Sequence, residues 1–416
     1  MPIQKSICLP AASPVDIAEF IPIIDHPLFQ VLRSRKQLGI NDLIFPGAQH
    51  TRFEHAIGTL ALTQRLCRIQ KMPAGEAHIL QVFALLHDIG HGPFSHQIEP
   101  VLPGDHHSIG LRCLEEMQPV LAQCGVEAAQ LQRMLNGDDA LAEWVSDRNL
   151  GTDKLDYLQR DALHIGFQGI PYIEKIQTYT VQTDKGLAIE EKFLEDVKQL
   201  QKFYSYLHQH GYLNKTALAA QRVLQRCVQE ELQCRHSSGE ELWKMRDWQL
   251  LSWLSSSQSS VGKMLYQCLL NRTFHRTFLS LKPQGYGFVE KTANKPISVY
   301  EWPLASLRKF SYQYQDLNKL SLLEDEIAEL CHIRPGEILF AAMPYFRKLI
   351  PKDVRVHAGG SQKDFWLLEK DRDHKKSLES DYLRTFAVRL LVIPEKREQL
   401  YKKAGQIEKF LLHKNE

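Results

Sequence analysis

Four residues that lie far apart in the chain carry side chains suited to one divalent metal ion. They are His55, the neighbours His87 and Asp88, and Asp153. Imidazole and carboxylate ligands together suit Fe, Mn, Ni or Zn, or a site shared with Mg. Such an ion activates a bound water and screens the negative charge of a phosphate, which would suit phosphoester hydrolysis. A lone His-Asp pair is more often a hydrogen bond at a helix end, so the interpretation depends on the full set.

Three helices are expected to position these residues. Residues 54–70 repeat apolar side chains at helical spacing, and residues 76–88 are apolar nearly all round, which is typical of a helix buried on most sides. Gly90 and the pair Gly92-Pro93 predict the end of this second helix. Neighbouring side chains there diverge by about 100°, yet both can reach one ion beside the helix end. A third helix, over residues 153–163, would supply the last ligand.

The overall composition is that of an ordinary globular protein. Apolar residues make up 44% and charged residues 24%, and 51 Lys and Arg stand against 49 Asp and Glu. Bulk charge therefore gives no argument for binding nucleic acid or a membrane. No apolar run approaches the ~20 residues that span a bilayer, and residues 1–14 do not resemble a signal peptide. The eight cysteines form no CxxC pair, so we expect reduced thiols of a cytoplasmic protein.

The chain of 416 residues is expected to fold as a mainly α protein in two parts. Residues 1–280 have the pattern of a helical core. From residue 281 the pattern changes to a smaller α+β region, 281–416, with helices near 322–331 and 395–412. Short strands are predicted in this region at 285–289, 297–300, 338–340, 365–368 and 388–393.

The segments around the candidate ligands carry a resemblance to a known family. They read HTRFEH at residues 50–55, HDIGHGPFSH at 87–96 and DKLDYLQRD at 153–161. Together with IDHPLFQVLR at 24–33, KQLG at 36–39 and FPGAQ at 45–49, they resemble the HD-domain phosphohydrolase superfamily. Within it the chain is similar to the deoxynucleoside triphosphate triphosphohydrolases. The similarity thins after about residue 166 and ends near residue 275, which implies that the helical core, 1–280, is an HD domain.

The resemblance implies roles for several histidines. The family's metal ligands match the four residues described first. The histidines that assist hydrolysis match His91, His96 and His107. Glu99 takes the place of a carboxylate that orients the last of these, and His106 competes with His107 for that position. An imidazole near neutrality can protonate a leaving oxygen. The alternative is that His96 or His107 is a hydrogen-bonded surface residue.

The resemblance also implies a substrate site. Positions that hold the triphosphate match Arg52, Lys154 and Tyr157, and positions that contact the deoxyribose match Gln37, Leu38 and Asp161. Arg binds two phosphate oxygens at once, Lys acts as a point charge, and Tyr is a neutral donor. Lys154 and Tyr157 are three residues apart and share a helix face. The alternative for Arg52, Lys154 and Asp161 is a set of surface ion pairs, which contribute little.

A nucleotide activator site is a further implication of the resemblance. Asp25, Gln30 and Arg33 match positions that bind a guanine in the family. The same residues could instead form a structural salt bridge. The preceding residues 7–10 read ICLP and lack the Asn-Asp-Pro-x-His segment common in relatives, a departure that bears on nucleotide activation.

These residues predict an enzyme that hydrolyses a dNTP to deoxynucleoside and inorganic triphosphate with a divalent metal. One alternative is an HD phosphohydrolase acting on another nucleotide, as a nucleotidase or phosphodiesterase, because the pocket walls decide the substrate. Another is a nucleotide- or nucleic-acid-binding regulator with weak hydrolysis. Basic segments at 370–376 and 396–403 could contact phosphates, but we expect solvated faces. The resemblance also implies a homo-oligomer. We do not expect the protein to bind a membrane.

Overall fold

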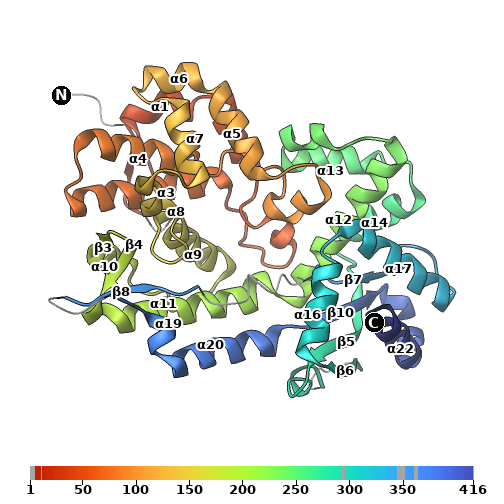
Figure 1. The fold of residues 1–416 in the computed structure, drawn as a ribbon. Coiled ribbons are helices and arrows are strands. Elements are labelled where there is room, and N and C mark those ends of the chain that lie inside the picture. The colour runs from red at the N-terminus through yellow and green to blue at the C-terminus, as the bar shows by residue number, and fades with distance from the viewer. Residues whose placement is uncertain (1–4, 11, 292–295, 344–351, 360–363, 416) are drawn as a thin grey trace.

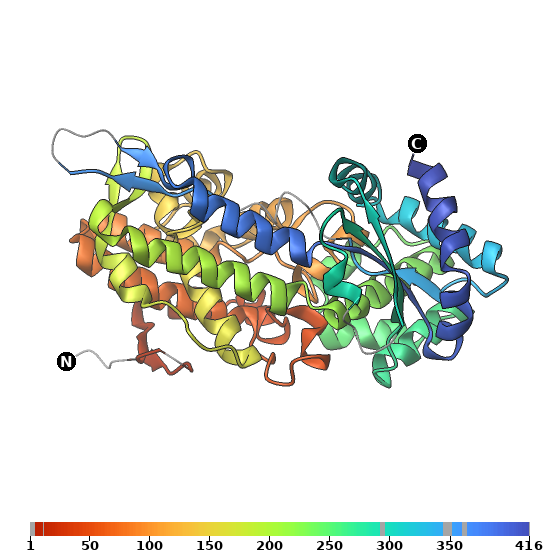
Figure 2. The same cartoon turned by 90° about the horizontal axis from the view of Figure 1, so that it is seen from below.

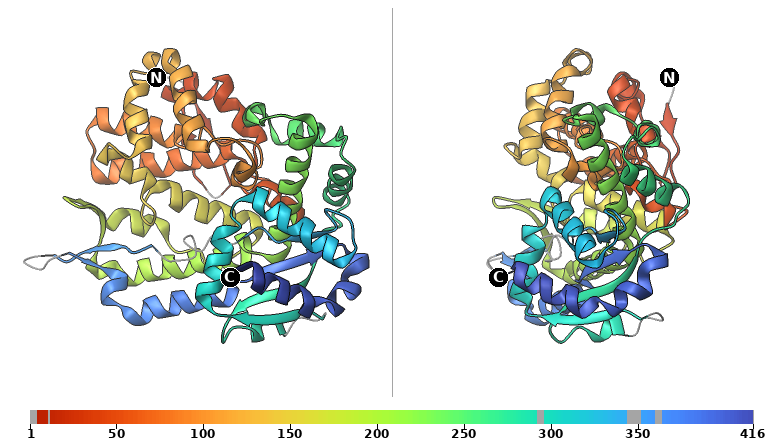
Figure 3. Two further views of the ribbon diagram at one scale, coloured as in Figure 1. Left: turned by 45° about the vertical axis from the view of Figure 1, so that its right-hand side comes forward. Right: turned by 90° about the vertical axis from the view of Figure 1, so that its right-hand side faces the viewer.

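The fold is mainly helical with small sheets, which confirms the expected fold class. The structure is a computed structural model that describes residues 5–10, 12–291, 296–343, 352–359 and 364–415. Figure 3 shows the N-terminal helices and the C-terminal sheet at opposite ends of the molecule. Within these ranges no helix is both long enough and apolar enough to cross a membrane.

The N-terminal part is a helical core (Figure 1), and at its start two short antiparallel strands pair. Its elements are β1 (Ser6–Ile7), β2 (Val15–Asp16), α1 (Ile21–Ile24), α2 (Pro27–Gln30), α3 (Arg52–Gln70), α4 (Ala74–Leu86), α5 (His106–Glu116), α6 (Gln118–Gln123), α7 (Ala128–Asn136), α8 (Glu143–Ser146), α9 (Thr152–Ile165), α10 (Ile173–Tyr179), β3 (Thr180–Thr183), β4 (Gly186–Glu190) and α11 (Leu194–Leu207). Helix α3 packs on both α4 and α9, and Ile57, Leu60, Leu85 and Leu155 are fully buried between them.

Local sequence explains how α3 is placed. The Thr51 hydroxyl accepts the N–H of Glu54 at 3.3 Å and caps the helix, which therefore begins at Arg52. Gly58 allows α9 to approach, since a Cβ there would lie 2.1 Å from Asp156 Oδ1 and 2.0 Å from Arg160 Nη2. The close approach brings the first turns of α3 and α9 together beside the end of α4.

Three helices form a second apolar core next to the first. They are α12 (Lys215–Arg235), α13 (Asp247–Ser255) and α14 (Ser260–Leu270). Val223 and Leu224 of α12 pack with Leu250 and Leu265, and this core also takes in Phe94 from the loop after α4. The loop that follows the candidate ligands His87 and Asp88 is therefore anchored on these helices.

The C-terminal part is built on a four-stranded sheet with the order β6-β5-β10-β7. Strand β5 pairs with β6 in parallel and with β10 antiparallel, and β10 pairs with β7 antiparallel. The elements are β5 (Arg276–Pro283), α15 (Phe288–Lys291), β6 (Ser298–Trp302), α16 (Leu304–Gln313), α17 (Leu317–Cys331), β7 (Ile338–Phe340), β10 (Val388–Val392), α21 (Arg397–Lys402) and α22 (Ala404–Asn415). Phe278, Phe310 and Leu390 are fully buried in this third core.

The chain then returns to the N-terminal part before it enters β10. Strand β8 (Arg355–His357) pairs with β4 in parallel and with β9 (Phe365–Trp366) antiparallel, which completes the sheet β3-β4-β8-β9. After α19 (Leu367–Lys370), α20 (Arg372–Thr385) runs alongside α11 (Figure 2). The expected division at residue 280 thus falls inside β5, and one segment of the expected C-terminal region packs on the first core. Long-range pairing decides this, and local sequence does not show it.

Most predicted C-terminal strands are present. The predictions at 297–300, 338–340 and 388–393 are confirmed as β6, β7 and β10. The prediction at 285–289 is wrong. Gly285 has a φ of +84° in a turn, and the Glu301 carboxylate accepts the N–H groups of Gly285 at 2.9 Å and Gly287 at 3.1 Å. At 365–368 the strand stops after Trp366, where α19 begins.

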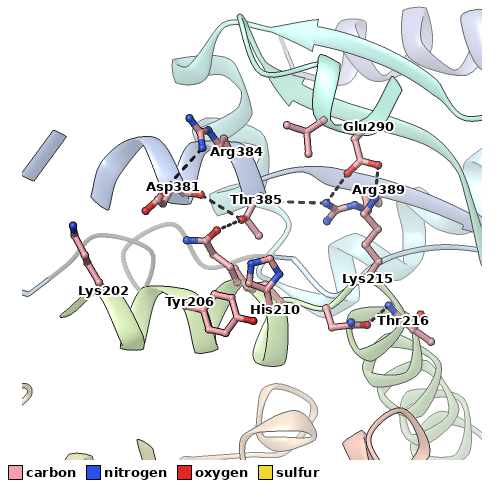
Figure 4. A pocket seen from close by; sticks show the side chains of 14 residues that line it. Lys202, Tyr206, His210, Lys215, Thr216, Glu290, Asp381, Arg384, Thr385 and Arg389 are labelled. Carbon is pink, nitrogen blue, oxygen red and sulfur yellow. Dashed lines mark hydrogen bonds and ion pairs between the residues drawn. The ribbon is translucent and has the colours of Figure 1, made fainter. Parts of the chain in front are cut away.

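Polar contacts join the parts around a cavity of about 670 Å³, shown in Figure 4. The buried Glu290 of α15 accepts Lys215 at the start of α12 at 2.8 Å and Arg389 of β10 at 2.9 Å. The Thr385 hydroxyl at the end of α20 donates to the side chain of Gln209 at 2.9 Å. These bonds tie α15 to α12 and to β10, and α20 to the turn that follows α11.

A buried ion pair also joins α12 to α17. Arg222, whose side chain is 0% exposed, donates to Glu324 through Nε at 2.9 Å and Nη2 at 2.7 Å. Glu324 Oε1 accepts the N–H of Phe340 at 2.9 Å as well. One carboxylate therefore links α12, α17 and β7.

We predict that Glu324→Gln lowers the free energy of unfolding by about 3–5 kcal/mol, because it leaves the charge of Arg222 in a dry site without its partner. The midpoint of urea denaturation measures this. Glu326→Gln on the same helix is the control, since Glu326 pairs with Lys414 at 2.8 Å on the surface and should matter by less than ~1 kcal/mol. Equal shifts in both variants would contradict the prediction.

Candidate active site

Three helix ends bring the candidate metal ligands together. His55 lies in the first turn of α3, His87 caps the end of α4, and Asp153 lies in the first turn of α9. His55 Nε2 lies 3.1 Å from Asp153 Oδ1 and 3.6 Å from Asp88 Oδ2. His87 Nε2 lies 3.5 Å and 3.6 Å from the same two atoms. The ligand atoms of all four residues lie within 4.8 Å of one another, so one ion could contact them all.

Both imidazoles turn Nε2 toward the centre of this group. His55 Nδ1 lies 2.8 Å from Asp156 Oδ2, and His87 Nδ1 lies 2.9 Å from the carbonyl oxygen of Ala84. A proton on each Nδ1 satisfies these bonds and leaves the Nε2 lone pairs for a metal, as is usual for ligating histidines. His87 Nε2 is buried without a hydrogen-bond partner. Arg160 holds Asp156 through bonds of 2.7 and 2.9 Å. The donor set therefore fits a divalent transition metal.

The electrostatics of the site favour a cation. Burial lowers the pKa of His55, but its hydrogen bonds with Asp153 and Asp156 outweigh burial and raise the pKa to about 10. Burial also opposes protonation of His87, and the charge of Asp88 raises its pKa nonetheless. Burial alone would raise the pKa values of Asp88 and Asp153, yet the imidazoles hold both well below their usual range. Partly buried carboxylates that stay ionised favour a positive charge at this point.

A second cluster of imidazoles lies beside the first and consists of His91, His96 and His106. Glu99 joins two of them, since its Oε2 lies 3.0 Å from His96 Nδ1 and its Oε1 lies 2.7 Å from His106 Nδ1. His91 Nε2 lies 3.3 Å from His96 Nε2, and the His91 and His106 rings stack at 4.1 Å. Burial lowers the pKa of His91, so its ring is neutral. The His96 side chain is 53% exposed, which makes it the member that solvent or a ligand reaches.

The structure places His106, and not His107, in this cluster, which corrects the expectation for His107. Asp105 caps α5 by accepting the N–H of Ser108 at 2.7 Å, so the helix begins at His106. His107 is turned by about 100° around the helix axis, and its Nε2 lies 2.9 Å from Asn136 Oδ1. The residue that the sequence offered as the competitor therefore contacts Glu99.

A cavity of about 460 Å³ opens beside the metal ligands. Among the residues expected to bind substrate, those that line it are Gln37, Leu38, Arg52, Tyr157 and Asp161. Gln37 Oε1 is buried without a hydrogen-bond partner, which leaves an acceptor for a ligand. Arg52 donates through Nε to Ser95 Oγ at 2.9 Å and through Nη1 to Asp88. We call this cavity, which Asp88, Asp153 and His96 also line, the active-site cleft.

Comparison with known proteins gives this site a family. Residues 52–160 match the family model of the HD domain, and they include all four ligands of the first cluster. Over 245 residues the chain is 28% identical to the human deoxynucleoside triphosphate triphosphohydrolase SAMHD1, which covers 47% of this chain and 39% of that protein. The chain therefore carries a segment that matches the HD domain, and it resembles the HD-domain phosphohydrolases.

Two further relatives of this HD-domain chain are informative. It is 30% identical over 244 residues to an uncharacterized protein of Methanocaldococcus jannaschii, across 58% of this chain and 52% of that protein. The chain thus spans about half the length of the curated relatives it matches. A crystal structure of a phosphohydrolase from Bacteroides thetaiotaomicron shares the fold, with a TM-score of 0.71 over 94% of this chain and 100% of that chain, at 21% identity.

Several residues of the HD-domain cleft were missed in the sequence. Tyr204, His208 and Tyr212 line it from the end of α11 and the π-helical turn that follows. The Tyr212 hydroxyl donates to Asp161 Oδ2 at 2.5 Å, and His50 Nε2 lies 2.8 Å from Asp161 Oδ1. The spacing of four residues between the first three places them on one helix face, a signal that could have been found.

Lys154 does not line the HD-domain cleft. Its ammonium group lies 3.4 Å from the centroid of the Tyr204 ring, and the residue is only 6% exposed. Burial lowers the pKa of Lys154 to about 7. Tyr204, rather than Lys154, is therefore the side chain that a ligand in the cleft would meet first.

The residues expected at the activator site lie outside the cleft. Asp25 and Arg33 are exposed. Gln30 Oε1 accepts Arg33 Nε at 2.8 Å, and the guanidinium lies 3.5 Å from the centroid of the Phe53 ring. In the part of the chain that the structure describes, no ion pair joins Asp25 to Arg33, so the salt bridge considered as an alternative is not formed. A guanine-binding role stays a prediction.

We predict that Asp156→Asn weakens metal binding by about 10–100-fold, because it removes the acceptor that orients His55. Titration of the purified protein with a chelator, followed by elemental analysis, measures the affinity. Asp161→Asn on the same helix is the control, since Asp161 bonds to His50 and Tyr212 instead of a metal ligand. An equal loss in both variants would refute the assignment.

Proposed function

We propose that this chain is a metal-dependent phosphohydrolase that converts a dNTP to deoxynucleoside and inorganic triphosphate. One observation carries the proposal: the candidate metal ligands and the imidazole cluster open onto the same cleft as Gln37, Arg52 and Asp161. The similarity to SAMHD1 supports a dNTP as the substrate, although this chain covers only part of that protein.

The metal would be held by His55, His87, Asp88 and Asp153. A divalent ion bound there supplies the chemistry that activates a water molecule and offsets phosphate charge. The mixture of imidazole and carboxylate suits Fe, Mn, Ni or Zn, or a site shared with Mg. Arg52, fixed by Ser95 and Asp88, would bind a phosphate oxygen.

His96 is the group that would protonate the leaving oxygen. Cleavage between the α-phosphorus and the 5′ oxygen leaves an alkoxide, which requires a proton. Both ring nitrogens of His96 face acceptors, Glu99 Oε2 on one side and the neutral ring of His91 on the other. His106 would act through Glu99, since His106 Nδ1 bonds to the second oxygen of that carboxylate.

Gln37, Leu38 and Asp161 would hold the sugar. The Asp161 carboxylate already accepts bonds from Tyr212 and His50, whereas Gln37 Oε1 has no partner. A 3′-hydroxyl could therefore donate to Gln37, and Leu38 would pack against the sugar ring. Preference for deoxyribose rests on the resemblance.

A nucleoside monophosphate is a second candidate substrate, because the cleft offers little positive charge. Among the described residues that line it, Arg52 is the one Arg or Lys, against Asp88, Asp153 and Asp161. Lys154 lies under the Tyr204 ring. A triphosphate carries more negative charge than a monophosphate, so its binding would require Tyr204 to move and uncover Lys154.

We propose a homo-oligomer on the strength of the resemblance to the family. The eight cysteines are all free thiols, which supports a reducing compartment such as the cytoplasm. Activation by a guanine nucleotide at Asp25, Gln30 and Arg33 is part of the same proposal.

Product analysis by chromatography tests these functions. The protein is incubated with each dNTP, NTP and dNMP, with Mn or Mg and with or without GTP, beside Asp88→Ala. We expect deoxynucleoside and inorganic triphosphate from a dNTP, lost in Asp88→Ala. Orthophosphate from a dNMP without turnover of triphosphates would establish the second candidate. No turnover of any substrate would reject both proposed activities and favour a binding role. DNA binding measured at several salt concentrations would then test that role.

We predict that His106→Gln lowers kcat by about 100-fold or more. The substitution removes the imidazole that contacts Glu99, and Glu99 in turn holds the acid His96. His107→Gln, one residue along α5, should leave kcat close to that of the wild type, because His107 bonds to Asn136. Steady-state kinetics on the best substrate from the product analysis measures both. A loss only in His107→Gln would assign the role to His107 and not to His106.

A further inference from the structure

Two strained residues precede His96. Phe94 has a φ of +53° and Ser95 a φ of +54°, in the left-handed region that residues other than glycine rarely adopt. Such conformations persist where the surrounding structure holds them in place. The segment that carries His96 into the cleft therefore needs contacts from outside itself.

Asp247, the first residue of α13, makes such contacts. Its Oδ1 accepts the N–H of Phe94 at 2.7 Å, and its Oδ2 accepts the N–H of Lys36 at 2.8 Å. The residue is 6% exposed. One buried carboxylate thus ties the segment that ends in His96 to the segment that continues into Gln37.

Arg35, next to Lys36, bonds to the segment before α13 and to the segment that carries His96. Its guanidinium donates to the carbonyl oxygens of His91, of Trp243 at 2.7 Å and of Met245 at 3.1 Å. Ser95 Oγ adds a bond to the carbonyl oxygen of Lys36 at 2.8 Å. Residues 243–247 are distant in sequence from both segments, yet they bond to each of them.

The carboxylate of Asp247 is turned away from its own helix. The N-terminus of α13 is capped by Gln249, whose Oε1 accepts the N–H of Arg246 at 2.9 Å. Burial raises the pKa of Asp247 to about 6, so the group is ionised at neutral pH and accepts at both oxygens. Helix capping does not account for a desolvated carboxylate at this position.

We propose that Asp247 is a positioning residue, which sets the spacing between the leaving-group acid His96 and the sugar-binding Gln37 by holding the N–H groups of Phe94 and Lys36. The expected effect on kcat rests on the proposed function, whereas the expected effect on the two backbone segments does not. An Asn at this position keeps the shape but offers one acceptor, and its NH2 group faces the second backbone N–H without bonding to it.

Asp247→Asn is the test variant, and Asp353→Asn is the matched control. Asp353 also ties two segments through one carboxylate, since its Oδ1 accepts the N–H groups of Val354 at 2.8 Å and Leu368 at 2.7 Å. It lies outside the cleft. Hydrogen exchange by mass spectrometry reports on the two backbone segments, 33–41 and 90–98, and elemental analysis reports the metal content of each protein.

Kinetics on two substrates separates positioning of the acid from general damage. One is the best nucleotide substrate, and the other is the p-nitrophenyl ester of thymidine 5′-monophosphate, whose nitrophenolate leaves without a proton. For Asp247→Asn we expect faster exchange in both segments, unchanged metal content and a kcat about 10-fold or more lower on the nucleotide, with little change on the ester. For Asp353→Asn we expect wild-type kinetics and wild-type exchange in both segments.

Unchanged exchange in Asp247→Asn, or an equal loss on both substrates, would overturn the proposal. If the wild-type protein turns over neither substrate, the proposed function fails, and exchange at residues 33–41 and 90–98 tests the positioning contact by itself. If Asp247→Asn does not fold, Asp247→Glu is measured in the same way. It keeps the charge but moves the carboxylate by one methylene, and it should show the same selective loss.

Discussion

The structure depends on keeping several carboxylates ionised where three helix ends meet. Asp156 is buried among α3, α4 and α9, Asp88 and Asp153 are partly buried where they line the cleft, and each has a positive partner there. Arg160 pairs with Asp156, and Arg52 pairs with Asp88. His55 and His87 contact Asp153, and a bound cation would replace the protons on these imidazoles. Removing Asp156 would leave Arg160 and His55 without their buried partner, a costly state, so Asp156 holds the first turn of α3 against α9.

The surrounding elements form the walls of the cleft beside this charged centre. The cleft is closed by α11, by α12 and by residues that follow β7, which come from parts of the chain far from the ligands. The segment from Gly92 to His96 packs on α12–α14 through Phe94, and the N–H of this left-handed residue bonds to Asp247 of α13. The rigid helices thus carry the charges, while the loop that carries the exposed imidazole depends on a more distant helix.

The sequence predicted what local patterns determine. The helices that bear His55 and Asp153 follow from apolar spacing, and the confirmed strands from β-branched runs. The choice between His106 and His107 depends on where α5 begins, and Asp105 decides this through a cap that the spacing of histidines does not reveal. Pairing of β8 with β4 and the contacts of Asp247 join segments separated by well over a hundred residues, so no local pattern predicts them.

The charge of the cleft constrains how a nucleotide could bind. Arg52 already neutralises Asp88, so it adds little net attraction for a phosphate until a cation takes over the carboxylate. Lys154 is desolvated against Tyr204, which favours its neutral form, and a phosphate nearby would favour the charged form instead. Metal binding at Asp88 would therefore free Arg52 for a phosphate, so metal and nucleotide should strengthen each other's binding through this residue.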